Sequence, residues 1–227
     1  MYENVMHWLK AKFVPLVVPA TVQTLEMVFF ATLFAIIIGL PLGVLLYVTD
    51  RERGIKKMPV LNQVINRIID IFRSVPFLVL MIVLFPLCRI IVGKAIGTEA
   101  TIIPLTIAAA PFVARLVETA LKEIDPGVIL ASQSMGSTNT QIIFKVLIPE
   151  CMPALVDGVT MTIINLIGYS AMAGAIGGGG LGDLAIRYGY QRFQNDVLIA
   201  SVVVILILVG IIQIAGTRIS TAMMKKR

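Results

Sequence analysis

A run of glycines is the first pattern in this sequence that could do chemistry. Residues 177–182 read GGGGLG and satisfy the spacing G-x-G-x-x-G, and Asp196 follows at nearly the distance that a dinucleotide site requires. In such a site the glycines follow a β-strand inside a strand–helix–strand unit. Here they end an apolar run, and the sequence shows no such unit. We therefore reject a nucleotide site, and the glycines predict either close helix packing or a movable gate.

Other patterns that support catalysis or metal binding are missing from the sequence. It contains no Gly-Lys-Ser or Gly-Lys-Thr for a phosphate-binding loop, and its single histidine, His7, has no neighbouring ligands. No paired carboxylates and no nucleophile with a base share a site. We predict that the chain is not an enzyme and binds no metal or cofactor of its own.

Arg115 and Glu118 are the charged residues whose spacing most clearly predicts a contact. Three residues apart, they can lie side by side on one face of a helix. We interpret them as a structural ion pair at the end of a membrane span, with a role in transport as the alternative.

The composition indicates an integral membrane protein. Of 227 residues, 58% are hydrophobic and only 14% are charged, with a mean hydropathy of +0.93. The net charge of +6 fits basic residues that flank apolar spans, so nucleic acid is not an expected partner. We predict that Cys88 and Cys151 lie near opposite membrane faces and serve as unpaired packing residues.

Three uncharged runs are long enough to cross a bilayer, which takes about 20 residues: 27–48, 159–182 and 197–217. Two shorter runs, 74–88 and 100–114, need their charged flanks to reach that length. In both, the charges would lie at one end of the span. The predicted spans are 22–48, 66–92, 99–122, 152–180 and 196–218.

The distribution of basic residues predicts the orientation of these five spans. The loop after the first span is rich in Arg and Lys, and the chain ends in KKR, whereas the other side is sparser. We predict an all-α, multi-pass membrane protein with its N-terminus outside and its C-terminus in the cytoplasm. Residues 1–18 form an outer segment, 19–217 one transmembrane domain and 218–227 a basic cytoplasmic tail.

The polar segment 125–149 carries no charge between Asp125 and Lys145. It lies between the third and fourth spans and is predicted to face the cytoplasm. Asp125 and Pro126 are typical of a helix start, Gly136 can take the positive φ that ends a helix, and Thr138 with Gln141 has capping-box spacing. We expect a second short helix to end at Pro149. Two short helices separated by a break are thus predicted.

Helices of about ten residues are marginal alone, so something must hold this pair. Apolar side chains on both sides of the break could enter a partner's groove, and small residues there allow close approach. These residues are Val128, Ile129, Leu130, Ile142, Ile143 and Phe144, with Ala131, Ser132 and Ser134 as the small ones. The alternative is a pair lying on the membrane, but such helices usually have a cationic face, which this segment lacks.

A resemblance to a known family adds to this reading. The residues ASQSMG and the closure at 146–149 resemble the EAA loop of ABC-importer permeases, which docks into an ATP-hydrolysing subunit. The stretch INLIGYSAMAGAIGGGGLGDLAIRYGYQRF, 165–193, resembles the methionine-importer permeases. FRSVPF at 72–77 and PLTIAAAPFVARLVETAL at 104–121 are similar to the same family.

The resemblance implies an ATPase-coupling loop in which five residues matter: Ala131, Ser132, Gly136, Phe144 and Pro149. One position departs from the family, because Leu130 replaces its glutamate. This chain would then dock by apolar packing or through another acid, such as Glu123 or Glu150.

Met172 is the one large, flexible side chain in the segment SAMAGAIGG. It is interpreted either as a core residue or, with the family resemblance, as a plug of the pore that offers a soft contact to a sulfur-bearing solute. Tyr169, Ser170 and Gly174 complete the candidate pore or gate.

The resemblance also implies the partners of the chain. They are a second copy of itself, two ATPase subunits that hold ATP and Mg, an extracytoplasmic methionine-binding protein and the lipid bilayer of a bacterial inner membrane. The predicted function is the permease of an ATP-driven methionine importer. The alternatives are an importer permease for another small solute and a homo-oligomeric channel.

Overall fold

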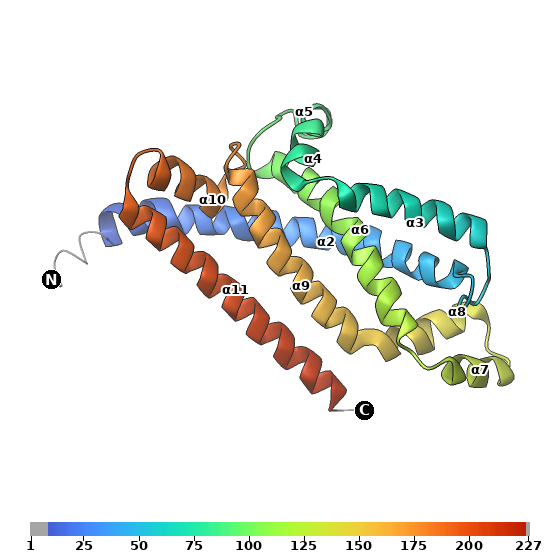
Figure 1. Cartoon of the computed structure of the whole chain (residues 1–227). Helices are drawn as coiled ribbons and strands as arrows, with labels where there is room; N and C mark the ends of the chain where they lie inside the picture. Colours follow the sequence, from blue (N-terminus) through green and yellow to red (C-terminus); the bar gives the residue numbers. More distant parts are fainter. Residues whose placement is uncertain (1–8, 226–227) are drawn as a thin grey trace. The chain divides into compact units, whose positions relative to one another are not determined.

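The computed structural model describes residues 9–225, and within that range the fold is entirely helical (Figure 1). This confirms the all-α prediction. The predicted segments 1–18 and 218–227 lie partly, and His7 wholly, outside the described residues. The helices are η1 (Leu9–Val17), α2 (Val18–Thr49), α3 (Pro59–Ser74), α4 (Phe77–Val83), α5 (Phe85–Val92), α6 (Thr98–Lys122), α7 (Pro126–Ser134), α8 (Asn139–Gln141), η2 (Ile142–Leu147), α9 (Ile148–Gly174), α10 (Gly180–Leu184), η3 (Ala185–Tyr190) and α11 (Asn195–Met224).

Within the described residues, three helical stretches are long and apolar enough to cross a membrane: Phe13–Thr49, Thr98–Lys122 and Asn195–Met224. They match the predicted first, third and fifth spans, and α11 continues beyond the predicted end at 218. The predicted fourth span corresponds to α9, which has 27 residues.

The predicted second span, 66–92, is three helices and not one. Helix α3 ends at Ser74, α4 begins after Pro76, and α5 begins after Leu84 with Pro86 in its first turn. Proline restricts the residue before it and lacks an N–H, so each of these prolines favours a new helix start. The chain then leaves α5 at Gly93, whose φ is +79°.

Two compact units divide the chain. Unit 1 comprises residues 1–33, 75–108 and 163–212, and unit 2 comprises residues 34–74, 109–162 and 213–227. The long helices α2, α6, α9 and α11 contribute residues to both.

Unit 1 has an apolar core built from the end of η1, the start of α2, α10 and the start of α11. Its buried members are Val17, Ala20, Leu181, Leu184 and Val197. Burying such side chains contributes about 1.5–3 kcal/mol for each large one when the alternative is water. This core brings the chain after the glycine run against α2.

In unit 2, small residues let α2 and α6 approach closely. A Cβ on Gly39 would lie 2.7 Å from the Ala110 carbonyl oxygen, and one on Gly43 would lie 2.5 Å from that of Ala114. Both glycines and both alanines are four residues apart, which is the small-xxx-small pattern of close helix pairs in membranes. Leu46, Ile69 and Ala114 extend this packing to α3.

Candidate functional site

The segment that was predicted to couple the chain to a partner begins with the expected cap. Asp125 accepts a 2.7 Å hydrogen bond from the Gly127 N–H at the start of α7, and Pro126 occupies the first turn. Gly136 has φ +78°. Thr138 and Gln141 form a complete capping box, with hydrogen bonds of 2.9 and 3.3 Å. These local predictions are confirmed.

The predicted end of this segment at Pro149 is wrong. Helical structure runs without interruption from Asn139 through η2 into α9, and Pro149 lies in the first turn of α9. The reason is the wide turn of η2, in which the Ile148 N–H donates to the Ile143 carbonyl. Proline has no N–H, so the carbonyl one turn before it lacks its usual hydrogen-bond donor. A wide turn of this kind tolerates that loss. The segment is therefore a short helix, a break and the start of α9.

The apolar side chains of this segment divide into a buried and an exposed set. Ile129 and Ile142 are buried, whereas Leu130 is 63% and Phe144 is 65% exposed. Sequence reasoning missed Met135, which is 79% exposed directly before Gly136. Its size and its place in the break were the signal that could have found it.

Of the five predicted coupling residues, four present surface and one does not. Ala131, Gly136, Phe144 and Pro149 are exposed. Ser132 is only 5% exposed, and its hydroxyl donates 2.8 Å to the Val128 carbonyl. Its side chain therefore packs inside unit 2 and offers no contact to a partner.

A hollow of ≈ 250 Å³ separates α7 from the loop that follows α2. Leu130 and Gln133 line it from α7, and Arg53, Gly54 and Ile55 line it from the loop. Leu130 is thus exposed at the edge of a concave surface, where an inserted apolar side chain would be desolvated.

A chain of paired charges lies in the same unit. Arg115 and Glu118 lie 2.7 Å apart, as their spacing predicts. Arg115 also contacts Asp70 of α3 at 2.9 Å, and Lys122 contacts Glu118 at 2.8 Å. The Glu118 side chain is only 4% exposed. A buried carboxylate of this kind needs its cations, because a buried charge without partners costs several kcal/mol.

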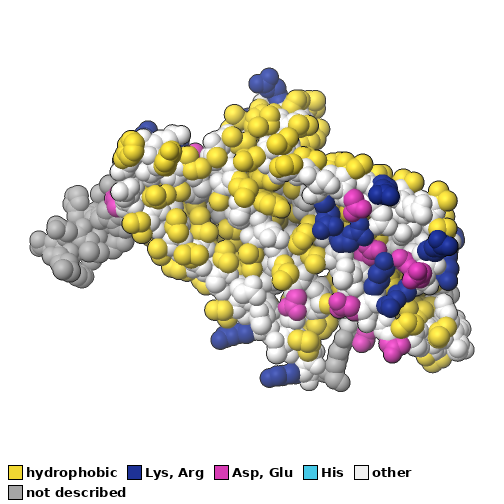
Figure 2. All heavy atoms as spheres, viewed as in Figure 1, with side chains coloured by type: hydrophobic (Ala, Val, Ile, Leu, Met, Phe, Trp, Pro, Cys, Tyr) yellow, Lys and Arg dark blue, Asp and Glu magenta, His cyan; other side chains and the backbone are white. Residues whose placement is uncertain are grey.

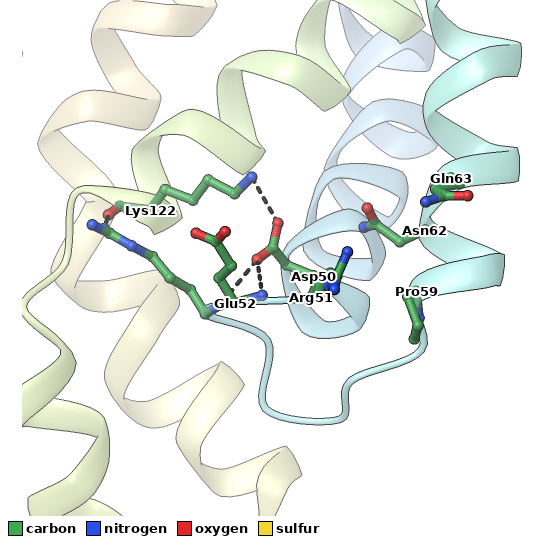
Figure 3. A pocket seen from close by; sticks show the side chains of 8 residues that line it. Asp50, Arg51, Glu52, Pro59, Asn62, Gln63 and Lys122 are labelled. Atoms are coloured by element: carbon green, nitrogen blue, oxygen red, sulfur yellow. Dashed lines mark hydrogen bonds and ion pairs between the residues drawn. The ribbon is translucent and has the colours of Figure 1, made fainter.

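Lys122 extends this chain of charges to the loop after α2. Its ammonium group lies 2.9 Å from Asp50 (Figure 3). The Arg53 guanidinium donates to the Lys122 backbone carbonyl. Lys122 is the last residue of α6, three positions before Asp125. The ends of α2 and α6 are therefore tied together next to the coupling segment.

Asp50 is the best-bound carboxylate of the loop. Its Oδ1 accepts 2.9 Å hydrogen bonds from the N–H groups of Glu52 and Arg53. Burial raises the pKa of Asp50, but the backbone donors and Lys122 outweigh that effect and the net pKa is lowered. Sequence reasoning named neither Asp50 nor Lys122, because their partners are remote in the chain.

Unit 1 holds the candidate pore residues, which do not form one site. Met172 is 49% exposed, so within the single chain it is not a core residue. Tyr169 stacks on Phe77 with ring centroids 4.8 Å apart, and Ser170 is buried with its hydroxyl donating to the Ile167 carbonyl. Gly174 is buried, and a Cβ there would overlap the backbone of Gly182 and Asp183. Only Met172 offers a free, flexible side chain.

The glycine run forms a turn between α9 and α10 that hydrogen bonds to α2 hold in place. Gly177, Gly179 and Gly180 have φ values of +86°, +83° and +78°, so the predicted fourth span stops at Gly174 and not at 180. The Gly180 N–H donates 2.9 Å to Gln23, and the Leu181 N–H donates 2.9 Å to Thr24. In this conformation the glycines serve close packing against α2.

Among the described residues, no group of three or more His, Cys, Asp or Glu side chains could hold a metal ion. Cys88 and Cys151 are both buried, which agrees with their predicted role in packing.

Comparison with known families places these features in context. Residues 39–225 match the family described as "Binding-protein-dependent transport system inner membrane component". The chain is 50% identical over 201 residues to the probable D-methionine transport system permease protein MetI of Vibrio cholerae, covering 88% of this chain and 89% of that protein. It is 53% identical over 165 residues to the methionine import system permease protein MetP of Bacillus subtilis, covering 73% and 74%.

Solved structures agree with this match. An inward-facing form of the MetNI methionine ABC transporter superimposes with a TM-score of 0.89 at 48% identity, covering 92% of this chain and 97% of that chain. A second inward-facing form has a TM-score of 0.86 at 49% identity, covering 88% and 93%. An amino acid ABC transporter crystallised with histidines has a TM-score of 0.72 at 19% identity, covering 96% and 97%, which shows a shared fold.

Proposed function

The chain belongs to the family of binding-protein-dependent transport system inner membrane components, and from that premise we propose that it is the membrane-spanning subunit of an ATP-driven methionine importer. Methionine is supported by relatives that are about half identical over most of both chains and are named for methionine transport. The same relatives do not favour another solute or a channel.

We propose five membrane crossings, with the N-terminus outside and the C-terminus in the cytoplasm. Three apolar helices, the 27-residue α9 and the broken set α3 to α5 supply them. The excess of Arg and Lys in the loop after α2 and at the C-terminus supports this orientation. A chain of this width needs a second copy to enclose a path, so the working unit is a pair of permeases in a bacterial inner membrane.

ATP hydrolysis belongs to separate subunits, one docked on each permease, and a binding protein delivers the solute from outside. Transporters named MetNI are among the structural relatives of this chain. ATP and Mg are expected on those ATPase subunits, and this chain contributes no catalytic group to them.

The single feature that carries the coupling mechanism is the break at Gly136 between α7 and the start of α9. Leu130, Met135 and Phe144 present apolar surface around it. We infer that these side chains seat in the ATPase, which explains how the segment docks without the family's glutamate at position 130. Movement of the segment would pass through Lys122 to Asp50 and through Glu118 and Arg115 to Asp70. The ends of α2 and α3 would then move with it.

Substitution of Gly136 by Val tests this role. A β-branched residue at φ +78° costs about 1 kcal/mol or more and would re-aim the helix that follows. Gly93 is a matched control, because it has φ +79° and, like Gly136, no atom within 4 Å of an added Cβ. Both variants would be purified with the ATPase and assayed for subunit retention and methionine uptake.

The expected result is that G136V loses the ATPase or hydrolyses ATP without uptake, while G93V keeps both activities. Equal retention and uptake in the two variants would show that the break is not the docking element.

A further inference from the structure

The loop between α2 and α3 carries four exposed basic side chains: Arg51, Arg53, Lys56 and Lys57. Its two acidic residues do not balance them. Asp50 is already bound by two backbone N–H groups and by the Lys122 ammonium. The loop therefore presents a net positive surface directly after an apolar span.

A hollow of ≈ 240 Å³ lies on this surface, lined by the loop, by the first turns of α3 and by Lys122. Figure 3 shows the side chains that line it. Glu52 points toward Lys122, whereas Arg51 lies on the opposite side with Asn62 and Gln63. The Arg51 and Gln63 side chains have no hydrogen bond or ion pair within residues 9–225. One side of the hollow thus offers a guanidinium and an amide as unused donors.

Helix α3 continues from the hollow with an exposed apolar stripe. Val60, Val64, Ile68 and Ile71 are 75%, 52%, 50% and 64% exposed. Their spacing of four, four and three residues places them on one helical face. Figure 2 shows charged side chains gathered over the part of unit 2 that contains α3, with hydrophobic surface beside them.

The length of this stripe matches one leaflet of a bilayer. Eleven residues separate Val60 from Ile71, which is about 16 Å along a helix that rises ~1.5 Å per residue. Half of a hydrocarbon core of ~30 Å is about 15 Å. Cations at one end of an apolar track of this length are the complement of a lipid with an anionic headgroup.

We propose that the basic loop and the α3 stripe together bind an anionic phospholipid. The phosphate lies against Arg51 and Gln63, Lys56 and Lys57 add attraction, and an acyl chain follows Val60, Val64, Ile68 and Ile71. The proposed topology places this lipid in the cytoplasmic leaflet. The ATPase-coupled function does not require the lipid, so the two proposals can fail separately.

Lipid retention tests the site directly. The permease with its ATPase would be purified in detergent, incubated with equal amounts of phosphatidylglycerol and phosphatidylcholine with matched chains, and analysed by native mass spectrometry. The wild type should retain phosphatidylglycerol preferentially, and Arg51→Gln should lower that retention about fivefold. Arg51 has no partner within residues 9–225, so its replacement leaves the fold intact.

Two further variants make the result specific. Arg89→Gln removes another exposed arginine, on α5, and should leave lipid retention unchanged. Val64→Asp places a charge in the stripe and should lower retention of the lipid while the ATPase stays bound. Equal phosphatidylglycerol retention in R51Q and R89Q would overturn the proposal.

The remaining outcomes assign the surface to another occupant. If R51Q releases the ATPase and keeps the lipid, the loop binds acidic groups of that subunit. If V64D separates the two permease copies and keeps the lipid, the stripe is a contact between copies. Methionine uptake in vesicles with and without phosphatidylglycerol separates the proposals, because uptake absent from both contradicts the importer and leaves the retention result standing.

Discussion

In unit 1 the helices are held by glycines, a hydroxyl and an amide. In unit 2 a series of paired charges also joins α3, α6 and the loop after α2. The turn after α9 is fixed by Gln23 and Thr24 and by the close approach of Gly174 to Gly182. Unit 2 also has a glycine contact between α2 and α6, but it adds the ion pairs around the buried Glu118.

The ion pairs of unit 1 are more exposed than those around Glu118. Lys94 and Glu99 are 66% and 63% exposed, and Arg187 is 57% exposed, although its partner Asp183 is 17% exposed. Exposed pairs contribute little, about 0–1 kcal/mol. Unit 1 therefore depends on steric fit and unit 2 on both fit and charge. A steric contact fails when atoms are added, and a buried charge pair fails when one partner is removed.

The largest effect is expected for Gly174→Ala in unit 1. The added Cβ would overlap backbone atoms of Gly182 and Asp183, which cannot rotate away. We expect a loss of about 3 kcal/mol, which lowers the unfolding temperature by about 6–12 °C. Gly168→Ala is the control on the same helix, because nothing lies within 4 Å of its Cβ. Equal unfolding temperatures for the two variants in detergent would refute the steric account of this turn.

A smaller loss is expected for Arg115→Met in unit 2. Glu118 keeps Lys122 but loses one of its two cations, and we expect about 2 kcal/mol of destabilisation because Arg115 is itself 28% exposed. Glu118→Gln in the same chain should restore part of the loss by removing the buried charge that has lost one of its two cations. Additive losses in the double variant would show that the two residues are not coupled.

Acid should affect unit 2 through Asp50. Its folded pKa lies below the ordinary value of 3.8, so its contribution is complete above that value and is lost as the pH falls through the folded pKa. Asp50→Asn should cost about 1 kcal/mol at neutral pH and should flatten the decrease in unfolding temperature below about pH 4. If the unfolding temperature of the variant decreases at acid pH as much as that of the wild type, other carboxylates determine the decrease.

The smallest effect on stability, but a visible effect on transport, is expected for Met172→Ala. Met172 is 49% exposed in unit 1, and Met161 on the same helix in unit 2 is 59% exposed. Neither replacement should lower the unfolding temperature appreciably. Only Met172→Ala should raise methionine leak through vesicles without ATP, because the thioether is proposed to narrow the path. The same leak in both variants would remove Met172 from the pore.

The helical fold and the local caps could be predicted because they depend on neighbouring residues. Asp125, Gly136 and the Thr138–Gln141 box are decided within a few positions of the chain. The break of 66–92 was missed because the apolar content of the segment outweighed Pro76 and Pro86. The helix through Pro149 was missed because a wide turn upstream accommodates the proline.

The coupling site could be predicted only in part, for the same reason. A sequence indicates that Ser132 and Ala131 are small, but only packing decides that Ser132 is buried and Ala131 exposed. Arg115 and Glu118 were found because they are three apart. Asp70 pairs with Arg115 from 45 positions away in the sequence, and Asp50 pairs with Lys122 from 72 positions away. No local spacing reveals such pairs.

Uptake in vesicles tests the central proposal most directly. The permease would be reconstituted with its ATPase, and radiolabelled methionine would be supplied outside together with the binding protein. The importer mechanism predicts accumulation above the outside concentration that requires ATP and hydrolysis that methionine and the binding protein stimulate. Equilibration of methionine to equal concentrations without ATP, with hydrolysis unaffected by methionine, would contradict it.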